Sequence, residues 1–174
     1  MVRILHWSIV FSIVVAYLTA YYRYWYTTQT EVANWYLLVI HLNFGLLILI
    51  LSLIMFVSRY RSSKIVAKTL SPNNVWLKLS AKIMHYTLYF MLISLPVSAL
   101  IGTGFDIPIA GVISLPGFFR SEFIEQLLQQ NFDMLMITFI EPFANYHRDI
   151  ASDIILPILL IGHIGAAIMH QKIK

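Results

Sequence analysis

Three histidines lie within or beside a long apolar run near the C-terminal end of this 174-residue chain, at residues 146–170. They are His147, His163 and His170, and the chain has six histidines in all. Titratable side chains are costly in hydrocarbon, so those found there usually serve a function. They can bind a cofactor or a metal, relay protons or hydrogen-bond to one another. The helices that carry the histidines help to choose between these chemistries.

The composition indicates an integral membrane protein. Hydrophobic residues make up 59% of the chain and charged residues 11%, whereas soluble domains contain about 25% charged residues. Cysteine is absent, which excludes disulfides, thiolate metal sites and iron–sulfur clusters. Metal chemistry would therefore depend on histidine and carboxylate. The net charge of +4 does not indicate nucleic-acid binding, because the basic residues flank apolar segments, where membrane topology explains them.

Four apolar segments are long enough to cross a bilayer as helices of about 20 residues. They cover residues 4–22, 35–58, 81–101 and 149–169. The first segment has no small-residue cleavage site, so we expect a membrane helix there rather than a signal peptide. The sequence therefore predicts one all-α integral membrane domain, residues 1–174, built as an up-down-up-down bundle of four helices.

The distribution of charge predicts the orientation. Residues 59–82, from the end of the second segment to the start of the third, hold six of the twelve Lys and Arg residues and no acidic residue. The positive-inside rule then places both termini in the cytoplasm. In a bacterial inner membrane, the opposite face would be periplasmic. A long periplasmic connection would join the third and fourth helices. In it, Ser121 is expected to cap a short helix, and residues 134–140 are expected to form an interfacial or capping lid, being too short to cross.

Four histidines then fall into two layers. His6 and His163 share a depth near the cytoplasmic face, and His41 and His147 share one near the periplasmic face. Two pairs on different helices are the arrangement that binds two haem b groups through axial histidines. Taken alone, an interfacial histidine such as His6 or His147 is more typical of a solvated neighbour of the lipid headgroups.

Small residues accompany one histidine of each pair. Gly45 follows His41 at i+4, and Ala166 and Ala167 follow His163 at i+3 and i+4, which are same-face positions on a helix. Small side chains leave room for a porphyrin plane. They equally allow close helix packing in lipid.

Basic residues near the two layers are expected to pair with haem propionates, because charge-assisted hydrogen bonds offset the burial of carboxylates. They are Arg3, Arg59 and Lys82 near the cytoplasmic layer and Arg148 near the periplasmic one. Topology signalling alone would explain the same residues. His85, at the cytoplasmic start of the third helix, is expected to serve a quinone headgroup, a propionate or a proton path. His170, at the membrane edge, is not expected to be an axial ligand.

Short segments in all four apolar stretches carry a family resemblance. They are RILHW at residues 3–7, VIHLNFG at 39–45, HYTLY at 85–89 with LPV at 95–97, and GHIGAA at 162–167. Together they resemble the bacterial cytochrome b561 family of two-haem, four-helix membrane cytochromes, related to the cytochrome b subunits of hydrogenases and formate dehydrogenases. The resemblance implies that His6 pairs with His163 and His41 with His147, in agreement with the pairing by depth.

An iron bound by two histidines has no vacant position, so the expected chemistry is outer-sphere electron transfer. The resemblance implies membrane quinone or quinol as a partner, including an oxidoreductase activity on quinol with superoxide or oxygen. Two alternatives are a haem-bearing anchor subunit for a larger dehydrogenase or hydrogenase and a histidine-based ion or proton transporter without haem. A transporter would favour intramembrane acidic residues, whereas Asp149 and Asp153 lie at the rim of the predicted fourth helix. The oligomeric state is left open.

The spacing of the two ligands in the fourth helix departs from the family pattern. The resemblance implies about fourteen residues between them, which at about 100° per residue returns both to the same helix face. Here the spacing is 163 − 147 = 16 residues, which on a regular helix leaves them about 160° apart. Pro157 lies between them, and a proline kink or a π-bulge would restore the face. Alternatively, His147 would reach its haem from a loop that precedes the helix.

Overall fold

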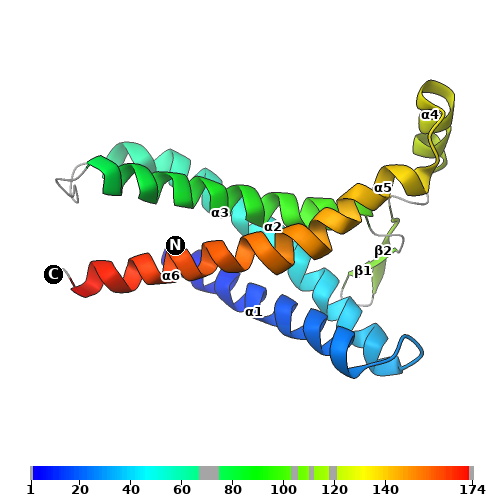
Figure 1. Ribbon diagram of the computed structural model, residues 1–174, viewed down its shortest axis with the longest axis horizontal. Helices are drawn as coiled ribbons and strands as arrows, with labels where there is room; N and C mark the ends of the chain where they lie inside the picture. The colour runs from blue at the N-terminus through cyan, green and yellow to red at the C-terminus, as the bar shows by residue number, and fades with distance from the viewer. Residues whose placement is uncertain (1, 67–74, 103–105, 110–111, 118–120, 173–174) are drawn as a thin grey trace.

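The computed structural model of the protein describes residues 2–66, 75–102, 106–109, 112–117 and 121–172, and it is almost entirely helical (Figure 1). Its helices are α1 (Val2–Tyr26), α2 (Val32–Val66), α3 (Val75–Gly102), α4 (Glu122–Phe132), α5 (Met136–Asn145), the π-helix η2 (Tyr146–Ile155) and α6 (Leu156–Lys172). A short antiparallel hairpin, β1 (Ile107–Ile109) and β2 (Ile113–Leu115), precedes α4. The sequence SPNN at residues 71–74 predicts a polar turn between the second and third spans, and these residues lie outside the described ones.

Four helical segments are long and apolar enough to cross a membrane, which confirms the predicted all-α membrane bundle. They are Val2–Tyr26, Val32–Arg59, Leu79–Gly102 and Met136–Met169. Large apolar side chains such as Phe11, Phe90 and Ile161 lie on the outside of the bundle, where lipid would cover them. The short helix predicted at Ser121 is also confirmed, because the Ser121 hydroxyl accepts a hydrogen bond from the backbone N–H of Ile124 at the start of α4.

The fourth span begins at Met136 rather than at residue 149. Helices α5, η2 and α6 continue into one another as a single long helix (Figure 1). The prediction of an interfacial lid at residues 134–140 is therefore wrong, because most of that run forms the first turns of α5. Charged residues at 141, 148, 149 and 153 interrupt the apolar run and concealed its continuity from the sequence. The connection between α3 and the fourth span is therefore shorter than predicted, because residues 136–148 belong to the span.

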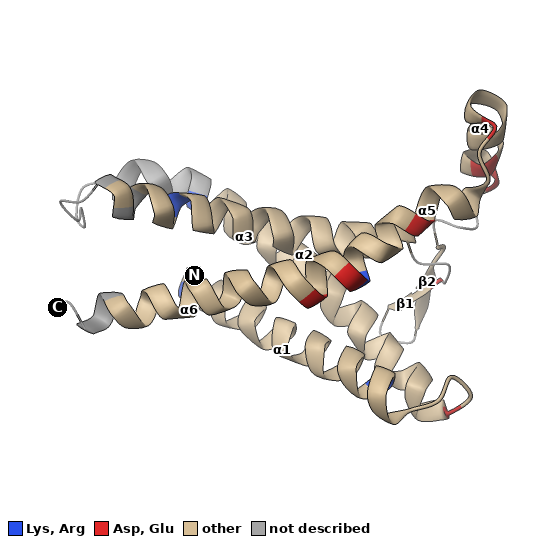
Figure 2. Ribbon diagram, viewed as in Figure 1, with Lys and Arg blue, Asp and Glu red and all other residues tan. Residues whose placement is uncertain are grey.

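The two ends of the bundle differ in their chain segments and in their charge. The start of α1, the end of α2, the start of α3 and the end of α6 lie at one end, here called the terminal side (Figure 1). The α1–α2 loop, the hairpin and α4 lie at the other end, the loop side. All eight acidic residues lie in the half of the molecule toward the loop side (Figure 2).

Two clusters of buried side chains hold the helices together. The first joins α1, α2 and α3 and contains Ile9, Ile13, Ala16, Ile48, Met55, Tyr89 and Leu92. The second joins α3 to the fourth span and contains Leu88, Met91, Ala151 and Leu156. Small residues allow the closest approach, and Ala151 is completely buried. Helix α1 therefore packs along α2, while η2 and α6 pack along α3.

Gly102, at the end of α3, marks a very close crossing with α5. A Cβ atom at this position would lie 2.7 Å from the Ala144 backbone nitrogen and 2.9 Å from its Cα. We expect Gly102→Ala to destabilise the protein by about 1–3 kcal/mol, because backbone cannot move aside as a side chain can. Thermal unfolding in detergent measures the loss. In the matched variant Gly165→Ala the new Cβ meets nothing within 4 Å, so equal melting temperatures for the two variants would contradict the prediction.

Candidate functional site

His41 of α2 and His147 of η2 face each other in the loop-side half of the bundle. Their ring centroids are 6.2 Å apart and their planes are nearly perpendicular, at 84°. Both rings are largely surrounded by protein, although they lie on different helices separated by more than a hundred residues of chain. The structure therefore brings together the two histidines that were paired by depth.

Backbone hydrogen bonds fix the tautomer of both rings. The Nδ1 of His41 lies 2.9 Å from the Ala16 carbonyl oxygen, and the Nδ1 of His147 lies 2.8 Å from that of Leu95. A carbonyl oxygen only accepts, so each Nδ1 must carry the proton and donate it. Each Nε2 is then left with a lone pair. A histidine held by its Nδ1–H in this way is oriented to bind a metal through Nε2.

The π-helix η2 supplies the irregularity that the sixteen-residue spacing requires. Its backbone bonds run from i to i+5, so each turn holds about one residue more than an α turn. A segment of ten residues absorbs about two residues in this way, which is the excess over the spacing of fourteen. The alternative in which His147 lies on a loop before the helix is wrong, because η2 lies between α5 and α6 in one continuous helix.

A cavity of about 1020 Å³ opens beside this histidine pair. It is lined by His41, His147 and Gly45, together with apolar residues of α1, α2 and α3. A Cβ atom added at Gly45 would meet nothing within 4 Å, so this glycine borders open space rather than a helix contact. Ile107 of β1 lines the cavity and is itself buried, so the hairpin closes part of the loop side.

Arg23 is a lining residue of this cavity that the sequence did not single out. Its Nε donates to the Oδ1 of Asn34 at 2.9 Å, and Asn34 in turn donates to the Thr27 hydroxyl at 2.8 Å. Asn34 is buried, which holds the arginine in place near His41. Arg23 and Asn34 are eleven residues apart, on either side of the α1–α2 turn, and this spacing was the one signal in the sequence. Apolar periodicity does not predict a side-chain hydrogen bond between two helix ends.

The second predicted pair, His6 and His163, also meets. Their ring centroids are 6.2 Å apart, the same distance as in the first pair, with a tilt of 57° between the planes. His85 of α3 packs against His163 from another side, with ring centroids 5.5 Å apart. The His85 Nδ1 donates to the carbonyl of Ala81 in its own helix at 2.6 Å. Three histidines from three helices therefore gather on the terminal side.

A comparison with known protein families agrees with this arrangement. The family model described as prokaryotic cytochrome b561 matches residues 1–174. The chain belongs to the prokaryotic cytochrome b561 family. It is therefore a haem b membrane protein that transfers electrons. Among curated proteins and among solved structures, none matches the chain significantly.

The geometry of this cytochrome b561 fits haem. Two metal–imidazole bonds of about 2 Å each, with half a ring beyond each, span roughly 6 Å between ring centroids. Both histidine pairs have 6.2 Å. Within the described residues no group of three or more His, Asp or Glu side chains is placed to hold a bare metal ion. A pair of histidines suits a metal whose remaining ligands come from a macrocycle.

The basic residues expected near haem are placed differently from one another. Arg59 lies within electrostatic reach of His163, and the Lys82 ammonium lies 5.9 Å from the centroid of the Tyr86 ring. Arg148 borders the large cavity, but its exposed side chain forms a salt bridge of 2.6 Å with Asp149. Sequence reasoning could place these residues by depth but not by the direction of their side chains.

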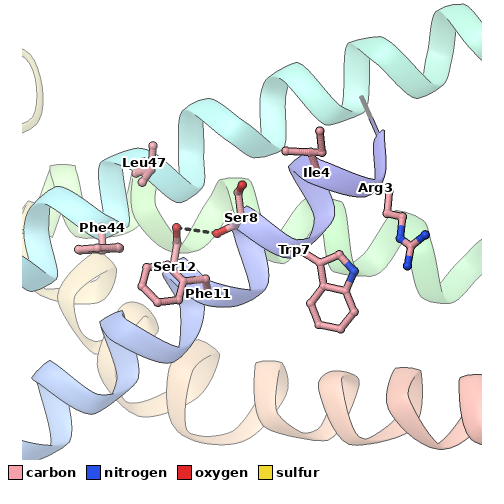
Figure 3. Close-up of a pocket in the computed structure, with 8 residues that line it drawn as sticks. All are labelled: Arg3, Ile4, Trp7, Ser8, Phe11, Ser12, Phe44 and Leu47. Atoms are coloured by element: carbon pink, nitrogen blue, oxygen red, sulfur yellow. Dashed lines mark hydrogen bonds between the residues drawn. The ribbon is translucent and has the colours of Figure 1, made fainter.

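Arg3 lies in a separate groove of about 680 Å³ between α1 and α2 (Figure 3). Trp7 and Phe11 line this groove and are mostly exposed, so it opens toward the outside of the bundle. Ala166 and Ala167 are likewise exposed on α6. The side chain of His170 is not among those described.

Proposed function

We propose that this cytochrome b561 binds two haem b groups, one between His41 and His147 and the other between His6 and His163. The observation that carries the proposal is the equal separation of 6.2 Å in two histidine pairs that lie in different halves of the bundle. Each pair joins the fourth span to another helix, α2 or α1. The fourth span would then contribute one histidine to each of the two cofactor sites.

The residues around the iron determine the chemistry. A haem b group held by either histidine pair would supply reversible one-electron chemistry of iron, with both imidazoles occupying the positions where a substrate could otherwise bind. His41 and His147 are fixed through their Nδ1 protons by backbone carbonyls, which keeps the rings still when the oxidation state changes. The α3 side chains that line the cavity are apolar, whereas charged residues such as Arg23 and Arg148 line other parts of it. The protein would act as an outer-sphere electron carrier.

The charge distribution supports an orientation with both termini in the cytoplasm. Arg59 lies near the end of α2 and Lys82 near the start of α3, which are helix ends on the terminal side (Figure 1), and the acidic residues lie toward the loop side (Figure 2). Electrons would pass between the two faces of the membrane, with quinone or quinol as the natural partner in the bilayer. We choose His85 as the quinone contact, because the centroid of its ring lies 5.5 Å from that of His163. Its Nδ1–H already donates to the Ala81 carbonyl, so its Nε2 is left for a quinone or quinol.

The test is haem quantitation on purified protein with a reduced-minus-oxidised spectrum. We expect two haem b groups per chain and spectra typical of six-coordinate, low-spin iron. One haem per chain would contradict the assignment of one pair, and a haem-free protein would contradict both. Reduction of the bound haem by a short-chain quinol then tests the proposed partner separately.

Arg23 offers a test of the loop-side site. We expect Arg23→Gln to lower the midpoint potential of one haem, because a nearby positive charge favours the reduced iron. For an assumed separation of about 12 Å and an effective dielectric of about 20, a unit charge contributes about 1.4 kcal/mol, or roughly 60 mV for one electron. A spectroscopic redox titration measures the shift. Arg148→Gln is the matched control, since Arg148 is exposed and already paired with Asp149, and an equal shift there would contradict a specific role for Arg23.

A further inference from the structure

The carbonyl of Ser152 lacks a backbone donor because of where η2 ends. In the π register each N–H bonds to the carbonyl five residues before it, and the last such bond runs from Leu156 to Ala151. The next would run from residue 157 to Ser152. Residue 157 is proline, which has no N–H. The π register therefore stops there and leaves the Ser152 oxygen without its expected partner.

The Tyr17 hydroxyl of α1 supplies the missing donor. It donates to the Ser152 carbonyl oxygen at 2.6 Å, across 135 residues of sequence. Tyr17 is half-buried and packs against both core clusters. A backbone carbonyl without a partner is costly in the interior of a membrane, so this bond offsets the loss that Pro157 causes.

The neighbouring Tyr21 makes a similar hydrogen bond, but to a side chain rather than to a backbone carbonyl. Its hydroxyl donates to the Oδ1 of Asp153 at 3.1 Å, and its ring stacks on that of Tyr17. The Asp153 carboxylate is exposed, and its Oδ1 also accepts a hydrogen bond from the Ser152 hydroxyl at 3.5 Å. Of these two tyrosines, only Tyr17 therefore replaces a missing backbone bond.

We propose that Tyr17 is a positioning residue that holds η2 in its π register. Because η2 carries His147 and sets the phase of α6, the register determines whether His147 faces His41 while His163 faces His6. The inference rests on the proposed function only in so far as these histidines hold haem. The link between Tyr17, Ser152 and Pro157 is a property of the protein itself and can be measured without haem.

The experiment combines Tyr17→Phe with Pro157→Ala in the full-length protein. Phenylalanine keeps the ring and its stacking on Tyr21 and removes only the hydroxyl. We expect Tyr17→Phe alone to lower the melting temperature by about 2–4 °C. In the Pro157→Ala background residue 157 has an N–H to offer, so the same change should lower it by less than half as much. Tyr21→Phe should have the same small effect in both backgrounds.

Two further measurements separate positioning from general packing. Amide hydrogen exchange in nanodiscs should be about fivefold to tenfold faster across residues 146–156 in Tyr17→Phe than in the wild type. In the haem-loaded protein, the electron paramagnetic resonance signal of the ferric haem should shift at unchanged haem content, because it depends on the angle between the axial rings, 84° for His41 and His147.

Equal losses of melting temperature in the two backgrounds, or unchanged exchange across η2, would overturn the inference. If the wild-type protein binds no haem but the coupling between Tyr17 and Pro157 is present, the proposed function fails while the inference on the register stands. If haem is bound and the signal does not respond to Tyr17→Phe, the proposed function stands and the positioning role fails.

Discussion

A His147→Ala variant is expected to bind one haem b per chain instead of two. The change removes one axial imidazole and leaves the His6–His163 pair untouched, because that pair lies on the other side of the bundle. Haem extraction and quantitation against protein concentration measures the loss. His41→Ala should remove the same haem, while His6→Ala and His163→Ala should remove the other, as a redox titration of the remaining haem would show.

Double variants make this prediction stricter. His41→Ala combined with His147→Ala should still retain one haem, because both changes affect one site. His147→Ala combined with His163→Ala should retain none. His170→Ala is the matched control, a histidine in the same helix that is not expected to ligate iron, and it should keep both haems. Two haems in His147→Ala, or none in His41→Ala combined with His147→Ala, would contradict the pairing.

Gly45→Trp is expected to exclude the loop-side haem while the protein remains folded. The cavity of about 1020 Å³ borders Gly45, and a Cβ atom there meets nothing within 4 Å. A tryptophan side chain buries about 150–250 Å² of surface, so it would fill the space that the macrocycle needs without displacing a helix. We expect one haem per chain and a helical circular dichroism spectrum equal to that of the wild type.

The control for this experiment places the same side chain on the outside of the same helix. Ile54 is 45% exposed on α2, so Ile54→Trp should keep both haems. If Gly45 served only close helix packing, Gly45→Trp would unfold the bundle instead of selectively losing one haem. Full haem content in Gly45→Trp would show that the cavity is not the haem site.

Apolar run length and histidine depth were enough to predict four spans and both histidine pairs. Depth follows from counting residues along a helix, so His6 could be matched with His163 before any contact was known. The start of the fourth span could not be found in this way, because the charged residues between 141 and 153 interrupt its hydropathy. The polar side of that segment turns toward the cavity and α1, as the bond between Tyr21 and Asp153 illustrates.

The direction of side chains was beyond the sequence. Arg148 was expected beside a propionate, but it is paired with Asp149, while Arg23 borders the cavity through its bond to Asn34. Such bonds join residues on different helices, and periodicity reports only which face of one helix is apolar. The sequence predicted that a π-bulge or a proline kink would absorb the sixteen-residue spacing between His147 and His163. Tertiary contacts such as the hydrogen bond from Tyr17 to Ser152 distinguish the π-helix from a kink.

The π-helix also changes how related genes should be sought. A search that demands a fixed interval between the last two ligand positions would pass over chains of this kind, since the interval here is longer by about one half-turn of helix. A pattern that allows the longer interval when a proline stands ten residues after the first of the two histidines, as Pro157 does after His147, would recover them. A tyrosine in the first helix, where Tyr17 stands, would be the third mark of such a subgroup.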